Sequence, residues 1–155
     1  MPHSWQEIVT ASSAETEAAA AALAARLADG AVVALRGNLG AGKTVFARGL
    51  ARAFGITEPV TSPTFTLVQE YRRPDGGWFF HLDLYRINAD ADAAAFGIEE
   101  FLFAPRAVTA VEWPECIAGL LGEPLTRDAA GRLGGVVPVL LASLPNGSRR
   151  LRLPA

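Results

Sequence analysis

One eight-residue segment restricts the possible folds of this chain more than any other. Residues 37–44 read Gly-Asn-Leu-Gly-Ala-Gly-Lys-Thr and match the pattern Gly-x-x-x-x-Gly-Lys-Ser/Thr in full. The apolar residues 31–36 before it predict a buried strand, and residues 43–54 predict a helix that Gly55 ends. A glycine-rich loop between a strand and a helix is the context in which this pattern binds phosphate, which argues against a chance glycine-rich turn.

The chemistry of this loop predicts a nucleoside triphosphate ligand, with ATP and Mg²⁺ as the leading choice. Glycines leave room for backbone N–H groups to turn toward phosphate oxygens, and the following helix adds its positive N-terminal end. Lys43 supplies a mobile charge for the outer phosphates, and Thr44 offers a hydroxyl to Mg²⁺. We predict that the nucleotide-binding residues include the whole loop and the residue after it: Gly37, Asn38, Leu39, Gly40, Ala41, Gly42, Lys43, Thr44 and Val45.

The sequence lacks the signatures of several nucleotide-dependent protein classes. It contains no Asn/Thr-Lys-x-Asp motif for reading guanine, no Leu-Ser-Gly-Gly signature of ABC-type ATPases, and no arginine-rich insertion like the lid of a nucleotide kinase. Its 155 residues predict a single domain, residues 1–155, and leave no room for a second substrate domain. A minimal ATPase or a small kinase-like protein remains.

Two acidic residues lie near the ends of apolar strands that the sequence predicts. Asp83 lies late in the strand predicted for residues 78–84, and Glu112 ends the one predicted for residues 107–111. Ligands of open α/β sheets bind beyond the carboxyl ends of the strands, where an acid can hold Mg²⁺ or position an attacking water. The alternative for each residue is a strand-end carboxylate in a cap or salt bridge. Trp113 follows directly and fits core packing or a partner surface equally well.

The segment after the predicted loop helix has the composition of a switch. Ser62 and Thr64 flank Pro63, and hydroxyls around a rigid proline could sense a terminal phosphate. The alternative is a plain turn that leads into a strand. We interpret His81 as a strand residue whose hydrogen bonds are satisfied locally, because the other histidine, His3, is not at metal-ligand spacing.

The remaining patterns predict an α/β domain with a mixed sheet. Ser12 and Glu15 have the spacing of a capping box that opens a helix over residues 12–28. Two hairpins are expected, one over residues 65–84 around a turn at 74–77, and one that joins strands at 136–142 and 149–153. Short helices are expected over residues 90–96 and 99–103, and residues 122–135 are predicted to be a loop.

Composition excludes several functional classes. A net charge of −2 does not favour a protein that holds nucleic acid by electrostatics alone. The single cysteine, Cys116, allows no intrachain disulfide and favours a reducing, cytoplasmic setting. No apolar stretch of about 18 residues predicts a membrane span, and the N-terminus has no signal-peptide pattern.

Five sequence segments together resemble the TsaE family of bacterial ATPases, which are needed to form threonylcarbamoyladenosine in tRNA. These segments, in order, are GNLGAGKT, SPTFTLVQEY, HLDLYR, FGIEEF and VEWPE. The resemblance covers about residues 12–115 and is much more specific than the phosphate loop alone. Asn38 stands where many members have aspartate, and Leu82 where phenylalanine is common; neither change affects the catalytic logic.

The resemblance implies a P-loop NTPase-like fold, with a mostly parallel central sheet flanked by helices and added hairpins. It implies slow ATP hydrolysis in concert with a TsaB–TsaD-like complex, with tRNA contacted only indirectly. Thr44 and Glu112 resemble the family's magnesium ligands, and Asp83 resembles the acid required for turnover and is also a candidate ligand. The expected catalytic residues are thus Lys43, Asp83 and Glu112. Further nucleotide contacts implied by the resemblance are Ser12, Ser13, Thr16, Trp113, Glu115 and Arg149.

Three functions remain open at this stage. The leading one is an accessory ATPase for tRNA modification, with weak intrinsic turnover because the sequence shows no evident arginine finger. The second is a small-molecule kinase that uses the same phosphate loop. The third is a nucleotide-gated binding module that does not hydrolyse ATP.

Overall fold

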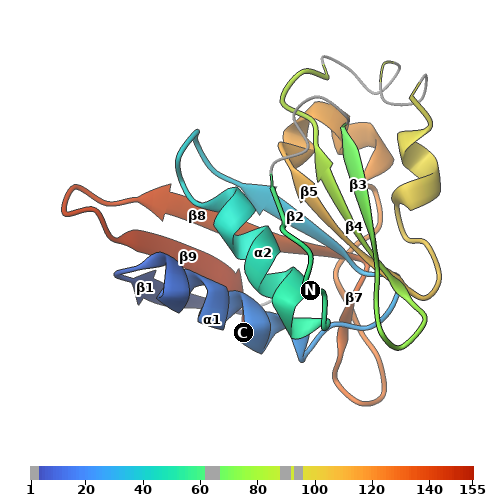
Figure 1. The fold of residues 1–155 in the computed structure, drawn as a ribbon, viewed down its shortest axis with the longest axis horizontal. Coiled ribbons are helices and arrows are strands. Elements are labelled where there is room, and N and C mark those ends of the chain that lie inside the picture. Colours follow the sequence, from blue (N-terminus) through green and yellow to red (C-terminus); the bar gives the residue numbers. More distant parts are fainter. Residues whose placement is uncertain (1–3, 62–66, 88–91, 93–95) are drawn as a thin grey trace.

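A seven-stranded sheet forms the centre of the molecule (Figure 1). The computed structural model describes residues 4–61, 67–87, 92 and 96–155. The strands lie in the order β1 (Trp5–Thr10), β9 (Arg149–Pro154), β8 (Val136–Ser143), β2 (Val32–Arg36), β5 (Ala107–Glu112), β4 (Trp78–Asp83) and β3 (Val68–Arg72). Strands β8, β2, β5 and β4 are parallel to one another. Strand β9 pairs antiparallel with β8, β3 pairs antiparallel with β4, and β1 pairs antiparallel with β9. The predicted α/β fold with a mostly parallel centre is confirmed.

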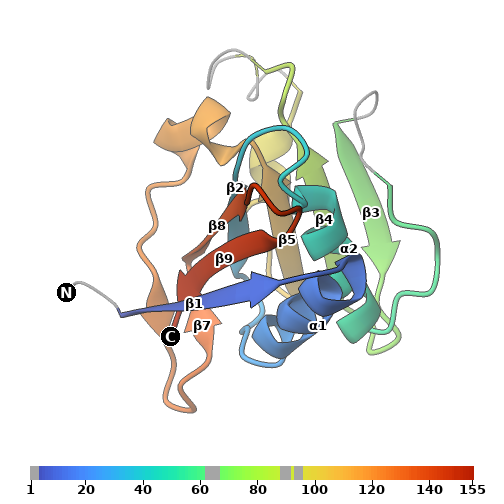
Figure 2. The ribbon, with the colours of Figure 1, turned by 90° about the vertical axis from the view of Figure 1, so that its left-hand side faces the viewer.

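Helices cover the sheet from both sides. The helices α1 (Ser13–Ala24) and α2 (Lys43–Ala53) lie side by side on one face, and Figure 2 shows them on one side of the edge strand β1. The two short 3₁₀ helices, η1 (Ile98–Phe101) and η2 (Pro114–Leu120), belong to the apolar cluster on the other face, with Ile98 and Ile117 fully buried. Alternating strand residues therefore enter two separate cores; Val33 packs toward α1 and α2, and Val32 packs toward η1 and η2.

Helix α1 begins as predicted and ends earlier than predicted. The Ser12 hydroxyl accepts a hydrogen bond from the Glu15 N–H at 3.1 Å, which is the cap that the sequence indicates. The helix ends at Ala24, and the expectation that it reaches residue 28 is wrong. Backbone groups beyond it bond to Leu133 instead: the Leu133 N–H donates to the Arg26 carbonyl at 2.7 Å, and the Ala28 N–H donates to the Leu133 carbonyl at 2.8 Å.

Leu133 belongs to a segment for which the prediction of a loop is wrong. Residues 122–135 contain a small two-stranded sheet of β6 (Thr126–Arg127) and β7 (Leu133–Gly134). The Asp128 carboxylate holds the turn between them by accepting the N–H groups of Ala130 and Arg132, both at 2.9 Å. These pairings are so short that the sequence carries no periodic signal for them.

The other predicted elements compare with the structure as follows. The strands predicted at 31–36 and 107–111, the helix after the loop, and both hairpins are confirmed within one or two residues at their described ends. The edge strand β1 and the helix η2 were not predicted. Most of the helix expected at 90–96, and the start of the strand expected at 65, fall outside the described residues. In the described part of the chain, no helix has the length and apolar character needed to cross a membrane.

Candidate functional site

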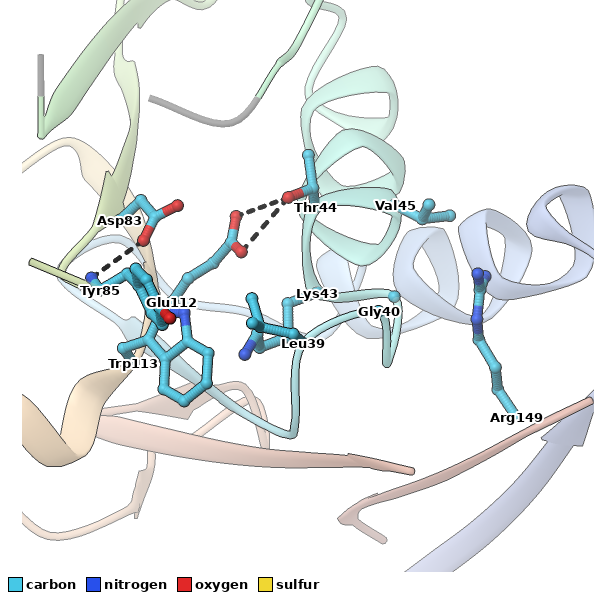
Figure 3. A pocket seen from close by; sticks show the side chains of 11 residues that line it. Leu39, Gly40, Lys43, Thr44, Val45, Asp83, Tyr85, Glu112, Trp113 and Arg149 are labelled. Atoms are coloured by element: carbon cyan, nitrogen blue, oxygen red, sulfur yellow. Dashed lines mark hydrogen bonds between the residues drawn. The ribbon is translucent and has the colours of Figure 1, made fainter. Parts of the chain in front are cut away.

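A cavity of about 410 Å³ opens at the carboxyl ends of β2, β5 and β4 (Figure 3). This is the edge at which ligands of open α/β sheets bind. The residues that line the cavity come from the loop and helix α2, from the ends of β4 and β5, and from β9: Leu39, Gly40, Gly42, Lys43, Thr44, Val45, Asp83, Tyr85, Glu112, Trp113 and Arg149. The structure thus brings together, around one space, most of the residues that the sequence singles out.

Two glycines of the loop allow close approaches that a side chain would prevent. A Cβ atom on Gly37 would lie 2.6 Å from the Leu141 carbonyl oxygen. Gly42 has φ of 102°, and a Cβ atom there would lie 2.9 Å from Nε of Arg149. Gly37, Asn38 and Ala41 are not among the residues that line the cavity. The loop backbone is therefore fitted tightly against β8 and β9.

Lys43, the first residue of α2, is held inside the protein. Its ammonium group donates a hydrogen bond to the Gly37 carbonyl and lies 3.4 Å from the centre of the Trp113 ring. Its side chain lies next to that ring in Figure 3. Burial lowers the pKa of Lys43 from its ordinary value, while the negative charges of Glu112, Glu115 and Asp83 act in the opposite direction. With Asp83 and Glu112 in its lining beside Lys43, the cavity carries both signs of charge.

Glu112 connects the loop helix to the interior of the sheet. The Thr44 hydroxyl donates to both carboxylate oxygens of Glu112, at 3.0 and 3.2 Å. On the other side, Nε2 of His81 lies 2.6 Å from Oε2 of Glu112, and the histidine is fully buried. Nδ1 of the same ring has no hydrogen-bond partner among the described residues. The sequence interpretation of His81 as a locally satisfied strand residue missed this contact.

Asp83 lies beside Glu112 because their strands are parallel and in register. The two residues are direct partners in the pairing of β4 with β5, and both are buried. Asp83 accepts the Tyr85 N–H at 3.1 Å through Oδ1. Since alternate residues of a strand face the same side, His81 also faces this side of the sheet. The side chains of His81, Asp83 and Glu112 thus form one polar cluster on the same side of the sheet.

Aromatic side chains close one end of the cavity. Trp113 has φ of 63°, a left-handed conformation that is uncommon outside glycine. Its ring centre is 5.1 Å from that of Tyr85, which is half exposed and which the sequence analysis did not select. Tyr85 follows the predicted Asp83 by two residues, so strand-end position was the available signal. The sequence left Trp113 open between core packing and a partner surface, and the structure places it in the cavity wall.

Arg149 lies at the opposite end from Trp113 and joins two cavities (Figure 3). The second cavity, of about 210 Å³, is lined by Thr10, Ser12, Ser13, Gly147 and Arg149. Ser12 and Ser13 therefore lie near the first cavity and outside its lining. Arg149, which the resemblance implies as a late nucleotide contact, thus lines the larger cavity.

Two other expected contacts, Thr16 and Glu115, lie outside the lining of the larger cavity. Thr16 is fully buried, shares a 2.7 Å hydrogen bond with the Thr10 hydroxyl, and lines neither of these two cavities. Glu115 is exposed at the start of η2 and outside the lining, although its charge acts on Lys43. The switch-like residues Ser62 and Thr64 fall outside the described residues.

Comparison with known proteins identifies the family. The family model of the threonylcarbamoyl adenosine biosynthesis protein TsaE matches residues 10–131. The chain is 41% identical over 121 residues to the tRNA threonylcarbamoyladenosine biosynthesis protein TsaE of Bacillus subtilis, which covers 77% of this chain and 73% of that protein. The protein of the same name from Synechocystis is 45% identical over 96 residues, 60% of each chain. The chain thus spans less than two thirds of the Synechocystis protein.

The fold is similar to that of a solved structure over the full length of the chain. The crystal structure of Bacillus subtilis YdiB superposes with a TM-score of 0.76 at 28% identity, covering 100% of this chain and 88% of that one. The family match extends over well more than half of the chain and includes the loop, both acidic strand ends and Trp113. The chain therefore belongs to the TsaE family of tRNA threonylcarbamoyladenosine biosynthesis proteins.

Proposed function

We propose that this protein binds Mg-ATP in the larger cavity and hydrolyses it slowly, in concert with a TsaB–TsaD-like complex that modifies tRNA. The observation that carries the proposal is the convergence of Lys43, Thr44, Asp83 and Glu112 on one space at the carboxyl ends of the strands. A cation for phosphates, two oxygen ligands for a metal and a further acid are the parts that phosphoryl transfer from ATP requires. The proposal assigns all four to a single site.

The residues present fit Mg²⁺. The hydroxyl of Thr44 and the carboxylate of Glu112 are hard oxygen ligands, already within 3.2 Å of each other. Mg²⁺ is usually held by one or two carboxylates together with substrate phosphates, so a complete protein cage is not needed. The chemistry that Mg²⁺ would supply there is positive charge that neutralises the phosphates. Thr44 and Glu112 would then hold the ion, and His81 would keep Glu112 in place.

Asp83 is proposed to act on the attacking water. It lines the same cavity, and its Oδ1 is fixed by the Tyr85 N–H. Glu112 already forms hydrogen bonds with Thr44 and His81. Asp83 ends β4, which lies one strand farther from β2 and the loop than β5, the strand that Glu112 ends. A buried carboxylate in that position is suited to orient a water molecule and accept its proton. Lys43 and the loop N–H groups would hold the phosphates.

Saturating Mg-ATP is expected to stabilise the folded protein. Because the site exists only in the folded chain, ligand at about a hundredfold excess over its dissociation constant should add about 2.7 kcal/mol to the free energy of unfolding. Thermal unfolding with and without Mg-ATP measures this, with AMP as the control that lacks the outer phosphates. A melting temperature that does not change with Mg-ATP would contradict nucleotide binding at this site.

Depletion of the protein is expected to lower threonylcarbamoyladenosine in bulk tRNA. Mass spectrometry of digested tRNA measures the nucleoside, and wild-type protein should restore it while Lys43→Ala should not. An unchanged level after verified depletion would remove the pathway role. The small-molecule kinase would then be tested by a search for a phosphorylated product.

A further inference from the structure

One half of the sheet is covered on a single face. Helices α1 and α2 pack on one side of β8, β9 and β1, as Figure 2 shows. The apolar cluster on the opposite side is built from β2, β4, β5 and the short helices, and includes no residue of β8, β9 or β1. The described residues therefore leave the outer side of these three strands without a helical cover.

Strand alternation and register identify the residues on the outer side of β8, β9 and β1. Arg36, Leu140, Arg152 and Glu7 are consecutive partners across β2, β8, β9 and β1. The next row contains Ala142, Arg150 and Val9. We call the following set the arginine face: Trp5, Glu7, Val9, Arg36, Leu140, Ala142, Arg150 and Arg152.

The charges on the arginine face are available to a partner. Arg36, Arg150 and Arg152 are exposed, and none of them forms an ion pair with another described residue. Arg152 lies over the ring of Trp5, with Cζ 5.4 Å from the ring centre. Trp5 and Val9 are among the exposed large apolar residues of the molecule. Arginine and tryptophan next to aliphatic side chains are the composition that protein interfaces favour at their centres.

We propose that the arginine face docks an acidic surface of a protein partner. Three cations around one acid, Glu7, give an excess of positive charge on a chain whose net charge is −2. Apolar side chains stand between the arginines, and this mixture suits a protein surface better than an RNA backbone, which usually meets a larger basic excess. The inference rests on the proposed function, whose TsaB–TsaD-like complex supplies the partner.

The position of the face relates it to the cavity. Arg36 is the last residue of β2 and directly precedes Gly37 of the phosphate loop. Arg150 follows Arg149, whose side chain packs against Gly42 and lines the cavity. A partner on this face would therefore contact β2 and β9, the two strands next to the phosphate loop. Partner docking and nucleotide binding would then both depend on the backbone position of Arg36 and Arg150.

The test compares two charge reversals in the full chain. Arg150→Glu changes the face, and its cross-strand neighbours Ala142 and Val9 carry no charge. The matched control is Arg72→Glu, another exposed strand arginine with an uncharged cross-strand partner, Trp78, at the far edge of the sheet. Both variants change the net charge equally. Arg152→Ala is the second face variant, since a glutamate at that position would oppose Glu7.

Calorimetric titration of each protein with the purified TsaB–TsaD pair measures binding at low and physiological ionic strength. Wild type should bind more weakly as salt rises, and Arg150→Glu should weaken binding by about tenfold or more. Arg72→Glu should match wild type, and Mg-ATP affinity should be unchanged in all variants. Equal binding by Arg150→Glu, Arg152→Ala and wild type would overturn the inference and leave the proposed function intact.

The remaining outcomes also decide the question. No binding of wild type to the pair, with Mg-ATP binding intact, would overturn both the partner assignment and the docking face. Loss of binding to purified tRNA in Arg150→Glu, with binding to the protein pair unchanged, would assign the face to RNA and overturn the inference. Thermal unfolding of each variant shows that the fold is retained.

Discussion

Asp83→Asn is expected to lower ATP turnover by about 10²–10⁴-fold, the usual range for removing a positioned acid–base group. The amide has nearly the same shape and keeps an oxygen that can accept the Tyr85 N–H. It lacks the charge needed to orient a water molecule and take its proton. Since Asp83 lies apart from the residues proposed to hold the phosphates, the affinity for Mg-ATP should stay close to that of wild type.

Phosphate release under saturating Mg-ATP measures turnover, and calorimetry measures the dissociation constant of the same protein. Glu115→Gln is the matched control, because it also removes a carboxylate near Lys43 from a side chain that is exposed and outside the cavity lining. Turnover by Asp83→Asn at the wild-type rate would show that the proposed role is wrong. A parallel loss of affinity would instead indicate that Asp83 holds the metal.

Lys43→Ala is expected to weaken Mg-ATP binding by about 10- to 150-fold, because a hydrogen bond to a charged group is worth about 1.5–3 kcal/mol. The lysine begins α2, where its ammonium group can reach phosphates that the loop holds. The effect should be larger for ATP than for AMP, since the outer phosphates are the ones that the lysine neutralises.

Titration of both nucleotides into wild type and Lys43→Ala measures the difference. Arg48→Ala, which removes a cation from the same helix outside the cavity lining, controls for a general change of charge. Thermal unfolding shows whether the buried position tolerates alanine. Equal ATP affinities of Lys43→Ala and wild type, with both proteins folded, would contradict the phosphate role of the loop.

The strand, loop and helix around residues 31–54 could be predicted because their signals are local. A buried strand, a glycine pattern and an amphipathic helix each require only neighbouring residues. The strand-end position of Asp83 and Glu112 could also be predicted, because strand ends can be found in the sequence. That the two residues are neighbours could not be predicted, because it depends on which strands pair, and the structure places β4 next to β5 in register.

Contacts between distant segments account for what the sequence did not predict. His81 reaches Glu112 across 31 positions of sequence, and only the register of two strands brings them within 2.6 Å. Arg149 reaches Gly42 because the chain returns through β8 and β9 to lie beside the loop. The short strands β6 and β7 were missed for a different reason: two residues are too few to show a period.

The contact between Lys43 and Trp113 has a consequence for ligand exchange. Within the protein, the ammonium group of Lys43 has two partners, the Gly37 carbonyl and the indole ring of Trp113. A cation over an aromatic face is worth about 0.5–2 kcal/mol. For a nucleotide bound as proposed, the measured affinity is the difference between the phosphate contacts and these resting contacts. In the proposed site, the Gly37 carbonyl and the indole ring would therefore compete with the phosphates for the lysine and lower the affinity for nucleotide.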